Sequence, residues 1–296
     1  MIPYVREIDV EYGRSDAVSP LIRRVIAPNP GPFTFTGTGT YIVGRGDVAV
    51  IDPGPELAEH LQALQRAVDG QRVTDIVVTH THNDHSPLSR ALAQATGARV
   101  WGRPAPAADD DGFPMDEAHD HAFRPDRLVH DGARIAGPGW TLEALATPGH
   151  ASNHVCYALI EENALFSGDH VMGWSTTVVS PPDGDMGHYY ASLDRVAARG
   201  FDTLWPTHGP PVTEVAPFLA AYKAHRLARE RQILEQLAAG RSRIGEMVPV
   251  IYADVDPRLH PAAAHSVLAH LIHLVRAGEV VSDGEPGLDS DYRLAG

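Results

Sequence analysis

Residues 79–85 read Thr-His-Thr-His-Asn-Asp-His and are the most informative segment of the chain. They follow directly on a run of mostly apolar residues that predicts a buried strand. Ligand-binding loops commonly lie at the carboxyl ends of such strands. In a loop, His80 and His82 can turn toward one metal ion while Asp84 and His85 turn toward a neighbouring one. Imidazole and carboxylate groups suit zinc, with iron and manganese as alternatives.

Three further segments each place a candidate ligand at the end of an apolar run. They are residues 147–150 (TPGH), 167–170 (SGDH) and 207–209 (THG). If the strands before them converge, their side chains meet those of residues 79–85. Because 17 histidines is a high number for 296 residues, the main question is which of them bind metal. The candidate ligands are His80, His82, Asp84, His85, His150, Asp169 and His208.

The apolar pattern predicts strands and helices that alternate along the chain. Strands are expected at residues 40–43, 48–51, 73–79, 98–101, 141–146, 154–160, 163–167 and 203–206, the first two as a hairpin. Helices are expected at residues 56–69, 87–95, 188–198 and 214–239. Residues 102–126, rich in Pro, Asp, Ala and Gly, predict an irregular surface loop. The alternation indicates a layered α/β fold with sheets inside and helices outside.

The pattern changes after residue 240. A short amphipathic segment at residues 244–251, a helix at 260–277 and two short strands near 280 and 292 predict a small winged-helix unit. This unit has three arginines against eight acidic residues, so it does not resemble a DNA-reading module. We expect it to serve packing or dimerisation and to close one side of the active-site groove.

Composition limits the classes of function. The formal charge of -14, from 24 Lys and Arg against 38 Asp and Glu, disfavours general nucleic-acid binding. The N-terminal residues show no secretory signal, and no apolar stretch is long enough to cross a membrane. The single cysteine, Cys156, excludes an intramolecular disulfide. We therefore expect a cytoplasmic protein with no membrane partner, and a homodimer is possible.

The four motifs, in this order, resemble those of the metallo-β-lactamase superfamily. The resemblance implies an αββα sandwich that holds two divalent metal ions, zinc before iron or manganese. It implies that His80, His82 and His150 bind the first ion, that Asp84, His85 and His208 bind the second, and that Asp169 bridges both. It also implies a catalytic domain at residues 1–212, a linker helix at 213–243 and a winged-helix-like domain at 244–296.

The resemblance extends beyond the ligands. Residues 29–55 and 262–281 resemble the opening hairpin and the winged-helix domain of the lactamase-β-like ribonucleases. One departure is Gly39, where related sequences usually carry Asn before Thr-Tyr. The departure puts a role of that Asn side chain in doubt, and leaves the fold prediction unchanged.

The predicted chemistry is hydrolysis by a hydroxide that bridges two metal ions. Asp84 is expected to act as the acid/base group, and His170, His188 and Tyr189 are the candidates to protonate the leaving atom. His154 is expected to support the ligands from the next strand, and His170 either supports them or contacts substrate. His119 and His121 have ligand-like spacing, but their Pro- and Asp-rich context favours exposed histidines over a third metal site.

Two substrate classes fit the sequence. A small ester, thioester or lactone is favoured by the acidic chain and by residues 149–154 (GHASNH), which resemble glyoxalase II. The alternative is single-stranded RNA, cleaved by an endoribonuclease, favoured by the ribonuclease resemblance and by a basic track on residues 214–243. Antibiotic β-lactamase activity is disfavoured, because the chain lacks an export signal and those enzymes lack a bridging Asp at this position. A small acyl substrate is therefore the preferred prediction.

Overall fold

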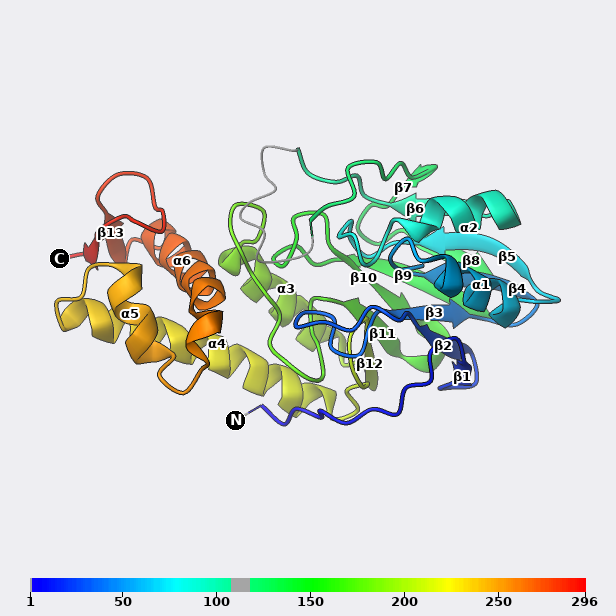
Figure 1. Cartoon of the computed structure of the whole chain (residues 1–296), viewed down its shortest axis with the longest axis horizontal. Coiled ribbons are helices and arrows are strands. Elements are labelled where there is room, and N and C mark those ends of the chain that lie inside the picture. Colours follow the sequence, from blue (N-terminus) through cyan, green and yellow to red (C-terminus); the bar gives the residue numbers. More distant parts are fainter. Residues whose placement is uncertain (1, 108–117) are drawn as a thin grey trace.

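The computed structural model describes residues 2–107 and 118–296, and two facing sheets form its centre (Figure 1). The first sheet has its strands in chain order, with β1 to β4 antiparallel and β4 to β7 parallel. Its strands are β1 (Ser15–Ala17), β2 (Ile22–Ile26), β3 (Gly39–Val43), β4 (Asp47–Ile51), β5 (Arg72–Val77), β6 (Arg99–Gly102) and β7 (Arg127–Leu128).

The second sheet has the order β12-β11-β10-β9-β8, in which β9, β11 and β12 run in the same direction. Its strands are β8 (Arg134–Gly137), β9 (Trp140–Ala146), β10 (Val155–Leu159), β11 (Ala164–Gly168) and β12 (Thr203–Pro206). Tyr41 and Ile51 of the first sheet pack between the sheets against Trp140, Tyr157 and Phe166 of the second. This shared apolar layer holds the two sheets face to face.

Helices cover the outer face of each sheet (Figure 1). On the first sheet, Leu64 of α1 (Ala58–Ala67) and Leu92 of α2 (Leu88–Thr96) pack against strand residues such as Val50. On the second sheet, Leu193 of α3 (Met186–Arg199) and Phe218 of α4 (Val215–Ala238) pack against the apolar side chains of its own strands. Residues 48–51 of β4 are all apolar, because both faces of the strand are buried there. The αββα sandwich is confirmed.

The C-terminal unit has an apolar core of its own. It contains α5 (Ile244–Ile251), the short η3 (Pro257–Leu259), α6 (His260–Arg276) and a hairpin of β13 (Val280–Ser282) and β14 (Tyr292–Leu294). Met247, Leu271 and Tyr292 pack there against Ile233 and Leu237 from the last turns of α4. The long helix α4 therefore belongs to both cores, as Figure 1 shows, and the winged-helix prediction is confirmed.

The structure adds elements that the sequence pattern did not reveal: β1, β2, β7, β8 and the 3-10 turn η2 (Ile160–Glu162). β2 reads IRRVI, and its two arginines interrupt the apolar run although Arg24 is buried. Within the predicted loop 102–126, β6 ends at Gly102, residues 103–107 and 118–126 contain no helix or strand, and residues 108–117 lie outside the described part. No helix among the described residues is long and apolar enough to span a membrane.

The packing of Trp140 supports a prediction about stability. A Cβ added at Gly137 would lie 2.5 Å from the Trp140 ring, which is fully buried and donates a hydrogen bond from Nε1 to the Asp47 carbonyl. We expect Gly137→Ala to lower the free energy of unfolding by about 1–3 kcal/mol because this core has no room for the methyl group. Urea unfolding would measure the loss. Gly245→Ala, with open space around its Cβ, is the matched control, and an equal loss in both variants would contradict the packing argument.

Candidate metal centre

The seven candidate ligands all follow the carboxyl ends of strands. His80, His82, Asp84 and His85 follow β5, and the other three candidates follow β9, β11 and β12. Because β9, β11 and β12 run in the same direction, their carboxyl ends share one edge of the second sheet. The two sheets pack face to face, so the loop after β5 reaches the same place. The topology thus gathers donors that lie up to 128 residues apart, from His80 to His208.

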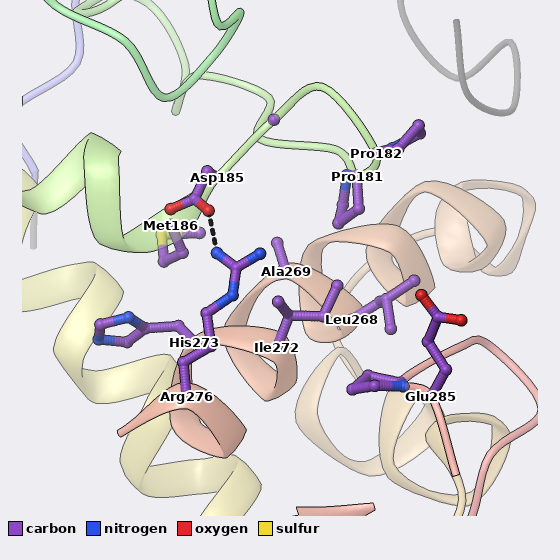
Figure 2. A pocket seen from close by; sticks show the side chains of 12 residues that line it. Pro181, Pro182, Asp185, Met186, Leu268, Ala269, Ile272, His273, Arg276 and Glu285 are labelled. Carbon is purple, nitrogen blue, oxygen red and sulfur yellow. Dashed lines mark hydrogen bonds and ion pairs between the residues drawn. The ribbon is translucent and has the colours of Figure 1, made fainter. Parts of the chain in front are cut away.

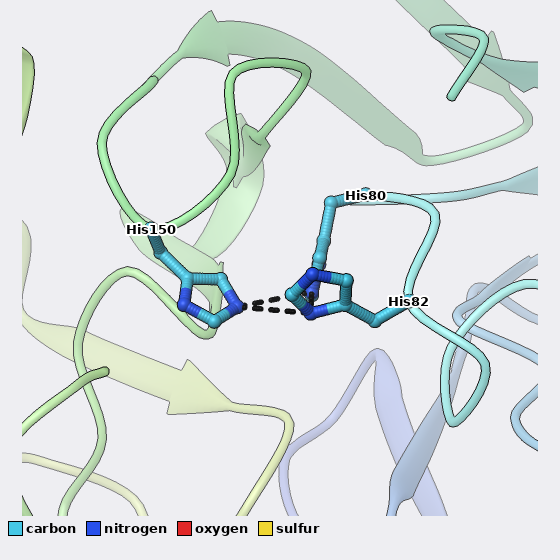
Figure 3. A group of neighbouring side chains, drawn as sticks. All are labelled: His80, His82 and His150. Atoms are coloured by element: carbon cyan, nitrogen blue, oxygen red, sulfur yellow. Dashed lines mark hydrogen bonds between the residues drawn. The ribbon is translucent and has the colours of Figure 1, made fainter. Parts of the chain in front are cut away.

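Three histidines form the first half of the centre, and Figure 3 shows their rings turned toward one another. His80 Nε2 lies 3.0 Å from His82 Nδ1, and His150 Nε2 lies 3.2 Å from His82 Nδ1 and 3.3 Å from His80 Nε2. Burial and the neighbouring imidazoles lower the pKa of both His80 and His82 well below the usual range. Neutral rings offer lone pairs, which is the form that binds metal.

Asp84, His85 and His208 form the second half. Asp84 Oδ2 lies 3.0 Å from His208 Nε2 and 3.4 Å from His85 Nε2. Burial alone would raise the pKa of Asp84, but the two imidazoles hold it well below its usual range. Burial lowers the pKa of His208, yet the Asp169 and Asp84 carboxylates together raise it to about 10. The Asp84 carboxylate is therefore ionised at neutral pH and available to a cation.

Asp169 lies between the two halves. Its Oδ2 is 3.4 Å from His208 Nε2, 3.6 Å from His85 Nε2 and 3.9 Å from His150 Nε2. His150 belongs to the first half and the other two histidines to the second. Asp169 therefore lies close to histidines of both halves.

The donor set fits two divalent cations. Asp169 Oδ1 and His85 Nε2 are buried and have no hydrogen-bond partner among the described residues. A buried polar atom without a partner costs about 1–3 kcal/mol, which a bound cation would remove. The first half offers three imidazole nitrogens, and the second offers two imidazoles and a carboxylate, all donors that zinc and iron accept.

In two of the candidate histidine ligands, the ring nitrogen that faces away from the centre donates a hydrogen bond to a backbone carbonyl. His150 Nδ1 donates to the Val178 carbonyl at 2.7 Å, and His208 Nδ1 donates to the Gly37 carbonyl at 3.2 Å. Because a carbonyl only accepts, each ring carries a proton on Nδ1, and Nε2 is the ring atom that faces the centre. Such contacts fix both the tautomer and the direction of a ligating histidine.

Asp52 is a site residue that the sequence prediction missed. Its Asp-Pro-Gly context predicts a turn, yet it is buried, and its Oδ2 lies 2.9 Å from His85 Nδ1. The same carboxylate accepts hydrogen bonds from the Thr79 amide at 2.8 Å and the Thr79 hydroxyl at 2.7 Å, and from Thr207 at 3.2 Å. Asp52 therefore ties the loops after β5 and β12 together beneath His85. The available signal was an acidic residue directly after a buried strand.

Replacing Asp52 with Asn is expected to weaken metal binding by about 10- to 100-fold, because His85 loses the carboxylate that orients its ring. Competition with a metal chelator would measure the affinity. Asp47→Asn, at the start of β4 where Asp47 pairs with exposed Arg72, is the control. Equal metal affinity in wild type and Asp52→Asn would contradict the orienting role.

The other predicted site residues fall into two groups. His154 is fully buried, accepts a hydrogen bond at Nε2 from the Asp169 amide (3.2 Å) and contacts Thr147 Oγ1 with Nδ1 at 2.9 Å. The Tyr189 hydroxyl donates to the His170 carbonyl at 2.8 Å, and its ring lies against that of buried His170, with 5.1 Å between centroids. These residues therefore surround the segment that carries Asp169.

His188 does not reach this group. Its side chain is 68% exposed in the first turn of α3, where its nearest charged partner is Asp185 at 3.8 Å. Burial raises the pKa of the Tyr189 hydroxyl well above its usual range. Neither residue is therefore suited to give a proton to a leaving atom at neutral pH.

The prediction that His119 is exposed was wrong. It is buried at the edge of the first half of the centre, where its ring lies 4.6 Å from that of His82. Its Nδ1 lies 2.9 Å from Thr81 Oγ1 and its Nε2 lies 3.3 Å from Asp183 Oδ2. The Pro- and Asp-rich sequence around His119 is typical of an exposed loop. A backbone bridge between His82 and His119 instead places this part of the loop against the centre. The clusters suited to metal among the described residues do not include His119.

Known families match most of the chain. Residues 34–208 match the model of the metallo-beta-lactamase superfamily, and residues 244–289 match that of the beta-lactamase-associated winged helix domain. A beta-lactamase-like protein 2 homolog from Caenorhabditis elegans is 32% identical over 90% of this chain and 88% of its own. An atrochrysone carboxyl ACP thioesterase from Aspergillus chevalieri is also 32% identical, over 84% of this chain and 76% of its own.

Solved structures agree with this match. A metallo-beta-lactamase family protein from Thermus thermophilus is 25% identical, with a TM-score of 0.75, over 94% of this chain and all of its own. A further solved structure, described as a di-iron-bound form, is 28% identical with a TM-score of 0.53, over 67% of this chain and 96% of its own. The chain belongs to the metallo-beta-lactamase superfamily and is a hydrolase that carries a C-terminal winged-helix domain.

Proposed function

We propose that the protein is a dinuclear metal-dependent hydrolase of small thioesters, with esters and lactones as related substrates. The observation that carries this proposal is the convergence of seven buried donors in two halves that share Asp169. A structural metal site is usually a closed four-ligand cage, whereas three ligands and a shared carboxylate leave positions for water and substrate.

In this proposal His80, His82 and His150 would hold one cation, Asp84, His85 and His208 would hold the other, and Asp169 would serve both. When bound, two such cations would polarise the substrate carbonyl and supply a nucleophile from water at neutral pH. We favour zinc, and the di-iron form of a relative makes iron the alternative. Asp52 and His154 hold His85 and Asp169 in place from behind.

Asp84 is the residue assigned to proton transfer. Its Oδ2 lies at the second half of the centre, 3.0 Å from His208 Nε2. The carboxylate orients the attacking water and accepts its proton. The Thr38 hydroxyl, 3.4 Å away, donates to the same oxygen and fixes its direction.

Two observations support an acyl substrate. The relatives of about 30% identity include proteins named as carboxyl ACP thioesterases, one of which matches 84% of this chain. The formal charge of -14 disfavours a polyanion. The cytoplasm is the proposed location, since a single free cysteine, Cys156, fits a reducing compartment.

The endoribonuclease alternative is less favoured because three of the six basic residues in the predicted track at residues 214–243 already have partners. Arg226 is buried and donates to the Thr177 carbonyl, and Arg229 donates to the Ile251 carbonyl at 3.0 Å. Lys223 pairs with Asp194 at 2.5 Å. These groups support the packing of α4 and are not free to line up along a phosphate backbone.

Initial rates on a panel of thioester, lactone, phosphodiester and single-stranded RNA substrates test the proposal. We expect turnover of thioesters that is lost on chelation and restored by added metal. Cleavage of RNA alone would show that the substrate assignment is wrong while leaving the metal centre intact.

A further inference from the structure

A cavity of about 360 Å³ lies between the catalytic unit and the winged-helix unit. Figure 2 shows the loop with Pro181 and Pro182 above it and α6 below it, with Leu268, Ala269 and Ile272 facing the gap. Met186, at the start of α3, lines the same space. Small-molecule sites commonly have volumes of about 300–1,000 Å³. The cavity is therefore large enough for an acyl chain or a small ring.

The charges around the cavity do not suit a phosphate. Arg276 is paired with Asp185, as the dashed line in Figure 2 marks, so its charge is already compensated. Glu285 at the opposite end adds a second carboxylate. The remaining lining is aliphatic, glycine or proline, with Met186 and His273. The cavity therefore favours an uncharged apolar group.

The loop over the cavity is attached to the metal centre at both ends. The Val178 carbonyl accepts the hydrogen bond of His150 Nδ1 at 2.7 Å, and the Asp185 amide donates to the Gly149 carbonyl at 2.8 Å. Between these points, Asp183 accepts a hydrogen bond from the Ser152 amide at 2.9 Å. The segment that carries a predicted metal ligand thus lies directly beside the wall of the cavity.

We propose that this cavity binds the acyl chain of the substrate and sets the chain-length preference of the hydrolase. The inference rests on the proposed function, since it assumes a thioester carbonyl at the metal centre. In this proposal the acyl chain runs past residues 149–150, which are hydrogen-bonded to the loop over the cavity, and its methylenes lie against α6. The winged-helix unit then contributes directly to substrate selection.

The proposal predicts a dependence on chain length. Each buried methylene is worth about 0.8 kcal/mol, so kcat/KM should rise roughly threefold to fourfold per methylene from the acetyl to the octanoyl thioester. Ile272→Trp fills the cavity and should remove most of this gain. Ala277→Trp adds the same ring to an exposed position just after the same helix, outside the lining, and should behave as wild type.

A binding measurement separates the two proposals. Calorimetry on the full chain would compare N-ethyloctanamide, in which an amide replaces the thioester, with its acetyl counterpart. We expect the octanoyl analogue to bind wild type and Ala277→Trp at least tenfold more tightly than Ile272→Trp. Thermal unfolding would verify that all three proteins fold.

The outcomes are distinct. If wild type hydrolyses no thioester, the proposed function is wrong, whereas tight octanoyl binding that Ile272→Trp weakens would still assign the cavity to an acyl chain. If thioesters are hydrolysed but neither rate nor binding depends on chain length or on Ile272→Trp, the acyl-cavity inference is overturned and the hydrolase proposal stands.

Discussion

Replacing Asp84 with Asn is expected to lower kcat by about 10²- to 10⁴-fold, the usual contribution of a positioned acid/base group. Asn keeps the shape and one oxygen donor but loses the charge that accepts a proton. Since His85 and His208 remain, we expect most of the metal to stay bound. Single-turnover and steady-state rates, together with metal content, measure the two effects separately.

Thr38→Val is the matched control for this change. It removes a hydroxyl that donates to the same Asp84 oxygen at 3.4 Å and leaves the carboxylate ionised. We expect a loss of less than tenfold, because a single neutral hydrogen bond is worth about 1 kcal/mol. If Asp84→Asn turned over as fast as Thr38→Val, Asp84 would have no role in proton transfer.

Replacing Asp169 with Ala is expected to have the second large effect. Its Oδ2 lies within 3.9 Å of histidines from both halves, so its loss removes a donor from each site at once. We expect metal content to fall from two ions toward one or fewer, and kcat/KM to fall by about 10³-fold, since metal polarisation is worth several kcal/mol.

Asp75→Asn is the control for Asp169→Ala. Asp75 is also buried, but it accepts from Trp101 Nε1 at 2.8 Å and pairs with Arg99, outside the predicted ligand set. We expect unchanged metal content in this variant. Loss of metal in both variants would indicate general destabilisation, and full metal content in Asp169→Ala would contradict the shared-ligand assignment.

The central part of the fold was predictable because its sequence signals are local. The strands before His80 and Asp169 contain apolar runs, at residues 76–78 and 164–166, so their positions could be read from the sequence. Burial on both faces explains the apolar run at residues 48–51 of β4. The short edge strands could not be read in this way. β8, with the sequence RIAG, has one buried residue, and its pairing with β9 is a tertiary property.

Site residues that lie in sequence motifs were predictable. Those whose role depends on a contact with a residue far away in the sequence were not. The seven candidate ligands lie in motifs, and the structure gathers them as expected. Asp52 looks like a turn residue because its sequence neighbours are Pro53 and Gly54, and only the fold brings it to His85. The sequence around His119 likewise suggests an exposed loop, because its partner Asp183 lies 64 residues away. Long-range partners of this kind have no sequence spacing to reveal them.

The two-metal centre is the claim on which the proposed function depends, and elemental analysis of the purified full chain tests it most directly. The arrangement of His80, His82 and His150, of Asp84, His85 and His208, and of the shared Asp169 predicts about two divalent ions per chain. Thioester turnover should rise and fall with that content. Less than one tightly held ion per chain, in protein supplied with zinc or iron, would contradict the dinuclear centre.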